Sequence, residues 1–128
     1  MYKMLIVDDE RTERECIRYL ITSAGLPLEL REAADAACAL QILKEWQAHI
    51  LFTDVQMPRT TGLTLAKQAA ELIPGIKILI FSSYAEFEYA RTAMALGIEN
   101  YILKPVVPHE LEKTLSGIIR QLDEEQHF

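Results

Sequence analysis

The stretch HILFTD, residues 49–54, is a short apolar run that ends in an acid. A run of this length, containing Ile50, Leu51 and Phe52 in succession, is typical of a buried β-strand and too short for a helix. The residue that follows the apolar part, Asp54, would then stand at the carboxyl end of that strand. The sequence therefore predicts a buried strand that delivers a carboxylate to one edge of a sheet.

Similar runs occur on both sides of this stretch and alternate with segments of helical period. The predicted strands cover residues 4–7, 28–33, 49–53, 76–81 and 101–103. The predicted helices cover residues 11–24, 36–46, 63–73, 87–94 and 108–122. Five strand–helix units in strict alternation favour an α/β fold with a parallel five-stranded sheet covered on both faces. Right-handed crossovers leave few topologies, and we expect the flavodoxin-like doubly wound (βα)5 order 2-1-3-4-5.

The apolar positions of these helices predict which faces are buried. The third helix is expected to point Leu63, Ala66, Ala70 and Ile73 inward, and the last helix Leu111, Leu115, Ile118 and Leu122. Cys16 and Cys38 also lie on faces that carry Ile and Leu, so we expect both cysteines to be small buried residues without a disulfide.

Length and charge limit the organisation and the partners of the chain. Its 128 residues fit one domain, expected at residues 1–122, with residues 123–128 as a solvated tail or the start of a linker to an absent output domain. The net charge is -6, without a long Lys/Arg cluster, which argues against direct binding to nucleic acid or to an acidic membrane surface. The sequence has neither a secretory signal nor an apolar run of the roughly 20 residues that a membrane span needs, so the expected location is cytoplasmic.

Chemically active residues follow several of the predicted strands. Asp8 and Asp9 come after the first strand, Asp54 after the third, Ser82 after the fourth and Lys104 after the fifth. In a doubly wound sheet these strand ends share one crevice. Clustered carboxylates suit Mg²⁺, and a lysine and a hydroxyl beside them suit a phosphoryl group. The pattern predicts phosphoryl transfer onto Asp54 beside a magnesium site.

Each of these residues also has an ordinary explanation when it is taken alone. Asp8 and Asp9 could cap the first helix, Asp54 could be a turn residue, and Lys104 could be an exposed lysine. Their joint placement at adjacent strand ends favours a site.

Four short motifs then give the chain a family resemblance. They are VDDE at residues 7–10, TDVQMP at 53–58 followed by Gly62, FSS at 81–83, and the pair Lys104-Pro105. Over essentially its whole length the chain resembles the receiver domains of two-component response regulators, which are phospho-accepting regulators rather than enzymes.

The resemblance implies roles for individual residues around Asp54. Asp54 would be the phospho-acceptor, Asp9 would bind Mg²⁺ directly, Asp8 would act mainly through water, and the backbone carbonyl of Gln56 would complete the protein ligands. The phosphoryl donor would be a sensor histidine kinase.

The resemblance also implies a switch. Lys104 would contact the phosphoryl group, Ser82 would move toward it, and Tyr101 would change rotamer and bias the face formed by helix 4, strand 5 and helix 5, with homodimerisation as a consequence. The Lys104–Pro105 peptide bond would be cis, a form that X–Pro bonds tolerate.

Residues 82–106 show a narrower likeness, to receivers of the YesN type, which usually precede an AraC-type helix-turn-helix domain. DNA binding would then belong to a C-terminal domain absent from these residues. Alternatives are a stand-alone receiver without DNA-binding output, a receiver-like binding module that takes no phosphate, and a flavin-binding module. From another class, a haloacid-dehalogenase-like Mg²⁺ phosphatase would use Asp8 as nucleophile, because DDERT at residues 8–12 nearly matches its signature.

Overall fold

The computed structural model describes residues 1–83 and 100–126. The strands are β1 (Tyr2–Val7), β2 (Leu28–Ala33), β3 (Ile50–Asp54), β4 (Lys77–Ser82) and β5 (Asn100–Leu103). The described helices are α1 (Arg11–Ser23), α2 (Ala36–Glu45), α3 (Gly62–Leu72) and α5 (Pro108–Glu125). The further helix expected around residues 87–94 lies outside the described residues.

The five strands form one parallel sheet in the order β2-β1-β3-β4-β5. This is the flavodoxin-like doubly wound order, and the predicted fold is confirmed. Because the order reverses between β1 and β3, the loops after these two neighbouring strands diverge to opposite faces and leave a crevice at their carboxyl ends. The topology therefore brings the loop after Val7 next to the loop after Asp54.

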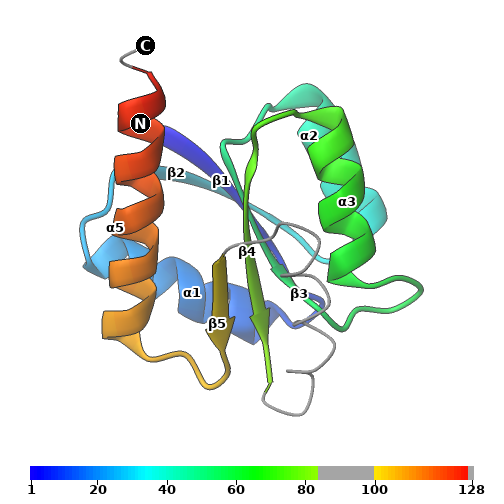
Figure 1. Ribbon diagram of the computed structural model, residues 1–128. Coiled ribbons are helices and arrows are strands. Elements are labelled where there is room, and N and C mark those ends of the chain that lie inside the picture. Colours follow the sequence, from blue (N-terminus) through cyan, green and yellow to red (C-terminus); the bar gives the residue numbers. More distant parts are fainter. Residues whose placement is uncertain (84–99, 127–128) are drawn as a thin grey trace.

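The helices cover the sheet in two layers, with α1 and α5 on one face and α2 and α3 on the other (Figure 1). Alternate residues of each strand feed the two cores: Phe52 of β3 packs with the α1/α5 side, whereas its neighbour Leu51 packs with the α2/α3 side. This alternation buries both faces of β3, whose five residues are all buried. The continuous apolar run that identified this strand in the sequence is a consequence of that double burial.

Helix α5 has the buried face that its sequence predicts, with Leu111, Leu115, Ile118 and Leu122 all against the sheet. It is longer than expected, since it continues to Glu125 where the sequence suggested a tail from residue 123. Two contacts hold the extra turn: the Tyr2 hydroxyl donates to Asp123, and Lys77 Nζ donates to Glu125 Oε1 at 2.6 Å. Both partners lie at the amino ends of strands, so the last turn of α5 is fixed to the edge opposite the crevice.

Two expectations about helix faces need correction. On α3, Ala66 is buried as expected and Ile73 packs against the core, but Ala70 is exposed. Leu65 and Ala69 are buried on this helix instead. Cys16 and Cys38 are free and exposed, since the buried stripes of α1 and α2 run through Ile17 and Ala39 and neighbouring turns instead.

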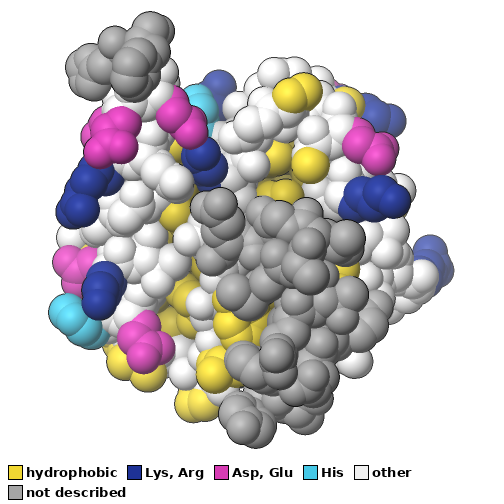
Figure 2. Space-filling model, viewed as in Figure 1, with side chains coloured by type: hydrophobic (Ala, Val, Ile, Leu, Met, Phe, Trp, Pro, Cys, Tyr) yellow, Lys and Arg dark blue, Asp and Glu magenta, His cyan; other side chains and the backbone are white. Residues whose placement is uncertain are grey.

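The coloured part of the surface mixes acidic and basic side chains around α5 (Figure 2). In residues 1–83 and 100–126, no helix combines the length and apolar character that crossing a membrane requires.

Candidate functional site

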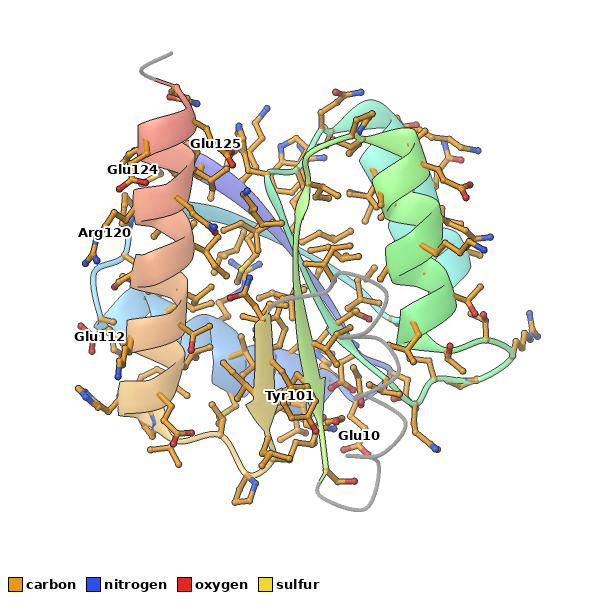
Figure 3. The ribbon with its side chains drawn as sticks, viewed as in Figure 1. Glu10, Tyr101, Glu112, Arg120, Glu124 and Glu125 are labelled. Atoms are coloured by element: carbon orange, nitrogen blue, oxygen red, sulfur yellow. The ribbon has the colours of Figure 1, made fainter. Side chains whose placement is uncertain are left out.

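The register of the sheet sets the position of the site. Thr53 is level with Val7, Asp54 with Phe81, and Ser82 with Leu103. The next residues along β1 and β5 are Asp8 and Lys104, so polar side chains from four strands meet at the carboxyl edge. In Figure 3, Tyr101 and Glu10 lie at this end of the sheet, and Glu125 lies at the other.

Asp54 is the buried centre of this group, with 5% of its surface exposed. Its Oδ2 accepts a hydrogen bond from Lys104 Nζ at 2.9 Å, and its Oδ1 accepts one from the Gln56 backbone N–H at 3.3 Å. The Thr53 hydroxyl donates to the Asp54 backbone carbonyl at 2.9 Å. The hydrogen bonds from Lys104 and Gln56 hold this buried carboxylate at a fixed place.

The loop after Asp54 is closed tightly against the strand. The Gly62 N–H donates to the Val55 carbonyl at 2.7 Å, and Gln56 and Thr61 form an antiparallel bridge. A Cβ on Gly62 would stand 1.9 Å from the Asp54 carbonyl oxygen, so only glycine leaves room for the chain to return so close to the acceptor.

The loop after β1 is held by a different set of bonds. Asp8 Oδ1 accepts from the Glu10 backbone N–H at 2.8 Å, which forms an Asx turn ahead of the helix. The N-cap of α1 is Glu10, without a side-chain capping bond, so Asp8 is not the helix cap that the sequence left open as an alternative. Arg14 Nη1 donates to the Asp8 backbone carbonyl at 2.7 Å. Arg14 also pairs with Glu32 at 3.1 Å, and Arg18 pairs with the other oxygen of Glu32 at 2.7 Å. These arginines join α1 to β2 and fix the backbone that presents Asp8.

The third carboxylate near Asp54 is Glu13, which sequence reasoning missed. Oxygens of Asp8, Glu13 and Asp54 all lie within 4.8 Å of one another. Glu13 lies in the first turn of α1, and its Oε2 accepts from Lys104 Nζ at 2.8 Å. The position of Glu13 in the sequence could have indicated this role. A helix that begins at Arg11 beside the crevice directs its first-turn side chains back toward the strand ends.

Asp9, in contrast, is exposed and lies outside this three-carboxylate group. Gln56 is also exposed, and the described bond from its backbone is the N–H to Asp54. The direct metal contact expected of Asp9 and the carbonyl contact expected of Gln56 remain predictions.

The cluster perturbs the acid–base behaviour of its members. Burial first, and then a hydrogen bond with Glu13, raise the pKa of Asp8 to about 8. The same hydrogen bond, together with Lys104, lowers the pKa of Glu13. Burial opposes the charge on Lys104, but the hydrogen bonds to Glu13 and Asp54 outweigh it, so the pKa of Lys104 lies above its usual value. The raised pKa of Asp8 and the lowered pKa of Glu13 both favour a proton on Asp8 that is hydrogen-bonded to Glu13.

The donor set fits a hard divalent cation. Carboxylate oxygens from β1, α1 and β3 converge without a sulfur or imidazole ligand among the three grouped residues. Mg²⁺ prefers such oxygen ligands and keeps several waters, which suits a site with few protein ligands beside a phosphate.

The proton on Asp8 predicts that cation binding depends on pH. Because the pKa of Asp8 is raised to about 8, a cation must displace its proton at neutral pH. The affinity for Mg²⁺ is expected to rise about tenfold per pH unit between pH 6 and 7.5 and to level off above pH 8. Isothermal titration calorimetry in two buffers of different ionisation enthalpy measures both the affinity and the released proton. An affinity that stays constant from pH 6 to 8 would contradict this.

Ser82 and Tyr101 are coupled directly. Ser82 is fully buried, and its Oγ lies 2.8 Å from the Tyr101 hydroxyl. The Lys104–Pro105 peptide bond that follows β5 is cis, and the Lys104 N–H donates to the Ser82 carbonyl at 2.7 Å. A change at the Ser82 hydroxyl would therefore alter a hydrogen bond of Tyr101.

The fold and the site together define the class of protein: a doubly wound α/β receiver with a carboxylate–lysine centre at the switch point of its sheet. The family profile described as response regulator receiver domain matches residues 4–116. The chain belongs to this family and is the receiver domain of a two-component response regulator. The haloacid-dehalogenase-like phosphatase, which the sequence left open as an alternative, belongs to a different family.

The relatives that the chain resembles are transcriptional regulators. It is 35% identical over 123 residues to the transcriptional regulatory protein YesN of Bacillus subtilis, covering 95% of this chain and 33% of the relative. It is 34% identical over 127 residues to HptR of Staphylococcus aureus, covering 98% of this chain and 50% of the relative. The chain thus spans half or less of the length of these relatives.

The solved structures that this chain resembles also belong to response regulators. The receiver domain of AraT from Geobacillus stearothermophilus superimposes with a TM-score of 0.88 at 35% identity, covering 98% of both chains. A two-component transcriptional regulator AraC from Clostridium phytofermentans also gives 0.88, at 30% identity, covering 99% of this chain and 98% of that one.

Proposed function

We propose that this receiver is a phosphorylation-dependent switch in which Asp54 accepts a phosphoryl group from a sensor histidine kinase. The observation that carries the proposal is the buried Asp54 carboxylate, bonded to Lys104 Nζ at 2.9 Å within a group of three convergent carboxylates. This is the arrangement that an aspartyl phosphate needs: a nucleophile, a fixed cationic side chain and a place for a divalent cation.

In the transfer step, one Asp54 oxygen forms a bond to phosphorus while the bond from phosphorus to the donor imidazole nitrogen breaks. Lys104 stabilises the negative charge on the transferring oxygens, and the Gln56 N–H orients the carboxylate. Burial of Asp54 excludes bulk water from one side of the acceptor. The protein's contribution is positioning and charge compensation rather than a catalytic cycle.

The residues that would hold Mg²⁺ are Asp8 and Asp54, with Glu13 beside them and Asp9 and the Gln56 carbonyl as the further ligands implied by the family. Bound there, the ion would supply positive charge to the phosphoryl oxygens.

The phosphoryl group carries about -1.5 to -2 units of charge, in place of the single negative charge of a free carboxylate. Its oxygens would draw the Ser82 hydroxyl away from Tyr101, and Tyr101 would then take another rotamer. Tyr101 also lines a hollow of about 680 Å³ between β5 and α5, whose other lining residues include Lys113 and Gln121. Tyr101 is hydrogen-bonded to Ser82 and also lines this hollow. A change in its rotamer would therefore connect phosphorylation to the β5–α5 surface.

That surface would be the output face, used for homodimerisation or for control of a neighbouring domain. Since the chain covers only part of YesN and HptR, whose names describe transcriptional regulators, we further propose an AraC-type DNA-binding domain as the output. Any contact with DNA would belong to that domain.

The test is covalent labelling of the purified chain. With acetyl phosphate and Mg²⁺, intact-mass spectrometry is expected to detect one added phosphoryl group, and with EDTA in place of Mg²⁺ none. Treatment with hydroxylamine should remove the group, because it cleaves acyl phosphates and leaves serine esters intact. A label that survives hydroxylamine, or that forms equally well in EDTA, would reject the proposal.

A further inference from the structure

Lys104 is shared between two acids that come from different elements, Glu13 on α1 and Asp54 at the end of β3. Its Nζ is 2.8 Å from Glu13 Oε2 and 2.9 Å from Asp54 Oδ2, and both contacts are hydrogen bonds. Asp8 Oδ2 is farther away, at 3.9 Å. An ammonium has three N–H donors, so two of the three are committed in the unmodified protein, one of them to a residue outside β3.

Glu13 is well placed to keep this contact. It stands on the first turn of α1, whose neighbouring residue Arg14 is fixed to the Asp8 carbonyl and to Glu32. Its side chain is only 30% exposed, and that of Lys104 only 22%, so solvent screens this pair less than a surface pair.

A phosphoryl group on Asp54 would compete with Glu13 for the Lys104 ammonium. The group needs the ammonium as its cation, but Glu13 already occupies one of the N–H donors and adds negative charge beside the phosphoryl oxygens. A divalent cation, in contrast, is attracted by the same charge. Glu13 should therefore favour the cation and oppose the phosphoryl group.

From this geometry we propose that Glu13 is a positioning residue that competes with the phosphoryl group for Lys104 and so shifts the switch toward its unmodified state. This rests on the proposed function, and it assigns to Glu13 a role that the motifs of the sequence did not indicate.

The test is Glu13→Gln, which keeps the shape of the side chain and removes its charge, assayed with two separate ligands. Mg²⁺ alone is titrated by calorimetry, and beryllofluoride, a tetrahedral stand-in for the phosphoryl group, is titrated by fluorine NMR at saturating Mg²⁺. Glu13→Gln is expected to weaken Mg²⁺ binding about fivefold and to strengthen beryllofluoride binding about fivefold, as for a partly screened ion pair. A merely structural role would not move the two affinities in opposite directions.

Glu10→Gln is the matched control. It removes the same charge three residues earlier, at the N-cap of α1, but Glu10 is exposed, and its described contact with the site is the backbone N–H to Asp8. It should change both affinities by less than about twofold. Thermal unfolding of both variants checks that they are folded.

The outcomes separate the two proposals. Wild-type protein that binds no beryllofluoride in Mg²⁺ would overturn the proposed function, and this inference with it. Normal wild-type binding together with Glu13→Gln affinities equal to those of Glu10→Gln would overturn the role of Glu13 alone.

Discussion

Replacement of Asp54 by Asn is expected to reduce incorporation of phosphate from acetyl phosphate or from a phosphorylated kinase by at least about a hundredfold, to background. The amide fills the same buried space, but its oxygen carries no charge with which to attack phosphorus. The variant also loses the charge-assisted hydrogen bond from Lys104 Nζ. Intact-mass spectrometry and radiolabel counting both measure the effect.

Asp35→Asn provides the control for this loss. Asp35 also follows a strand, but its carboxylate caps α2 by accepting from the Cys38 N–H at 2.7 Å. Asparagine caps helices about as well as aspartate, so this variant should remain folded and take phosphate normally. Undiminished labelling of Asp54→Asn would place the acceptor elsewhere and reject the proposed function.

Replacement of Gly62 by Ala is expected to have the largest effect on stability. The new Cβ would lie 1.9 Å from the Asp54 carbonyl oxygen and 2.8 Å from its carbon, and both are backbone atoms that cannot move without shifting the end of β3. Relief of such a clash would also strain the Gly62 N–H bond to Val55. The free energy of unfolding should fall by about 3 kcal/mol or more, as measured by urea denaturation.

Gly117→Ala tests the same chemical change where space is free. Gly117 lies in α5, and a Cβ there would meet nothing within 4 Å. Alanine should therefore raise the free energy of unfolding by about 0.5–1 kcal/mol, since glycine weakens a helix interior. Equal effects of the two substitutions would show that crowding at Gly62 is not the cause.

The fold could be predicted from the sequence because its strands are short, apolar and separated by helices of clear period. The continuous apolar run of β3 identifies a strand buried on both faces, and the four inward positions of α5 identify its packed side. The strand ends then place Asp8, Asp54 and Lys104 together, because parallel strands end at one edge.

What the sequence did not predict depends on contacts between distant elements. Glu13 is recognised as part of the site only when α1 is docked so that its first turn faces Lys104. The last turn of α5 looks like a polar tail until Tyr2 and Lys77 are placed beside it. The tight approach of Gly62 to Asp54 is likewise not encoded by the helical periodicity of α3.

The attachment of the last turn of α5 also has a mechanical consequence. A tension applied to the carboxyl end of this helix would first load two polar contacts at the rim, Tyr2–Asp123 and Lys77–Glu125, before the leucines beneath it. The carboxylate of the second contact is 55% exposed, so dissolved salt screens the attraction. This end of the helix should therefore detach from the sheet under a smaller force as ionic strength rises. The apolar packing of Leu111 and Leu115 should stay unchanged.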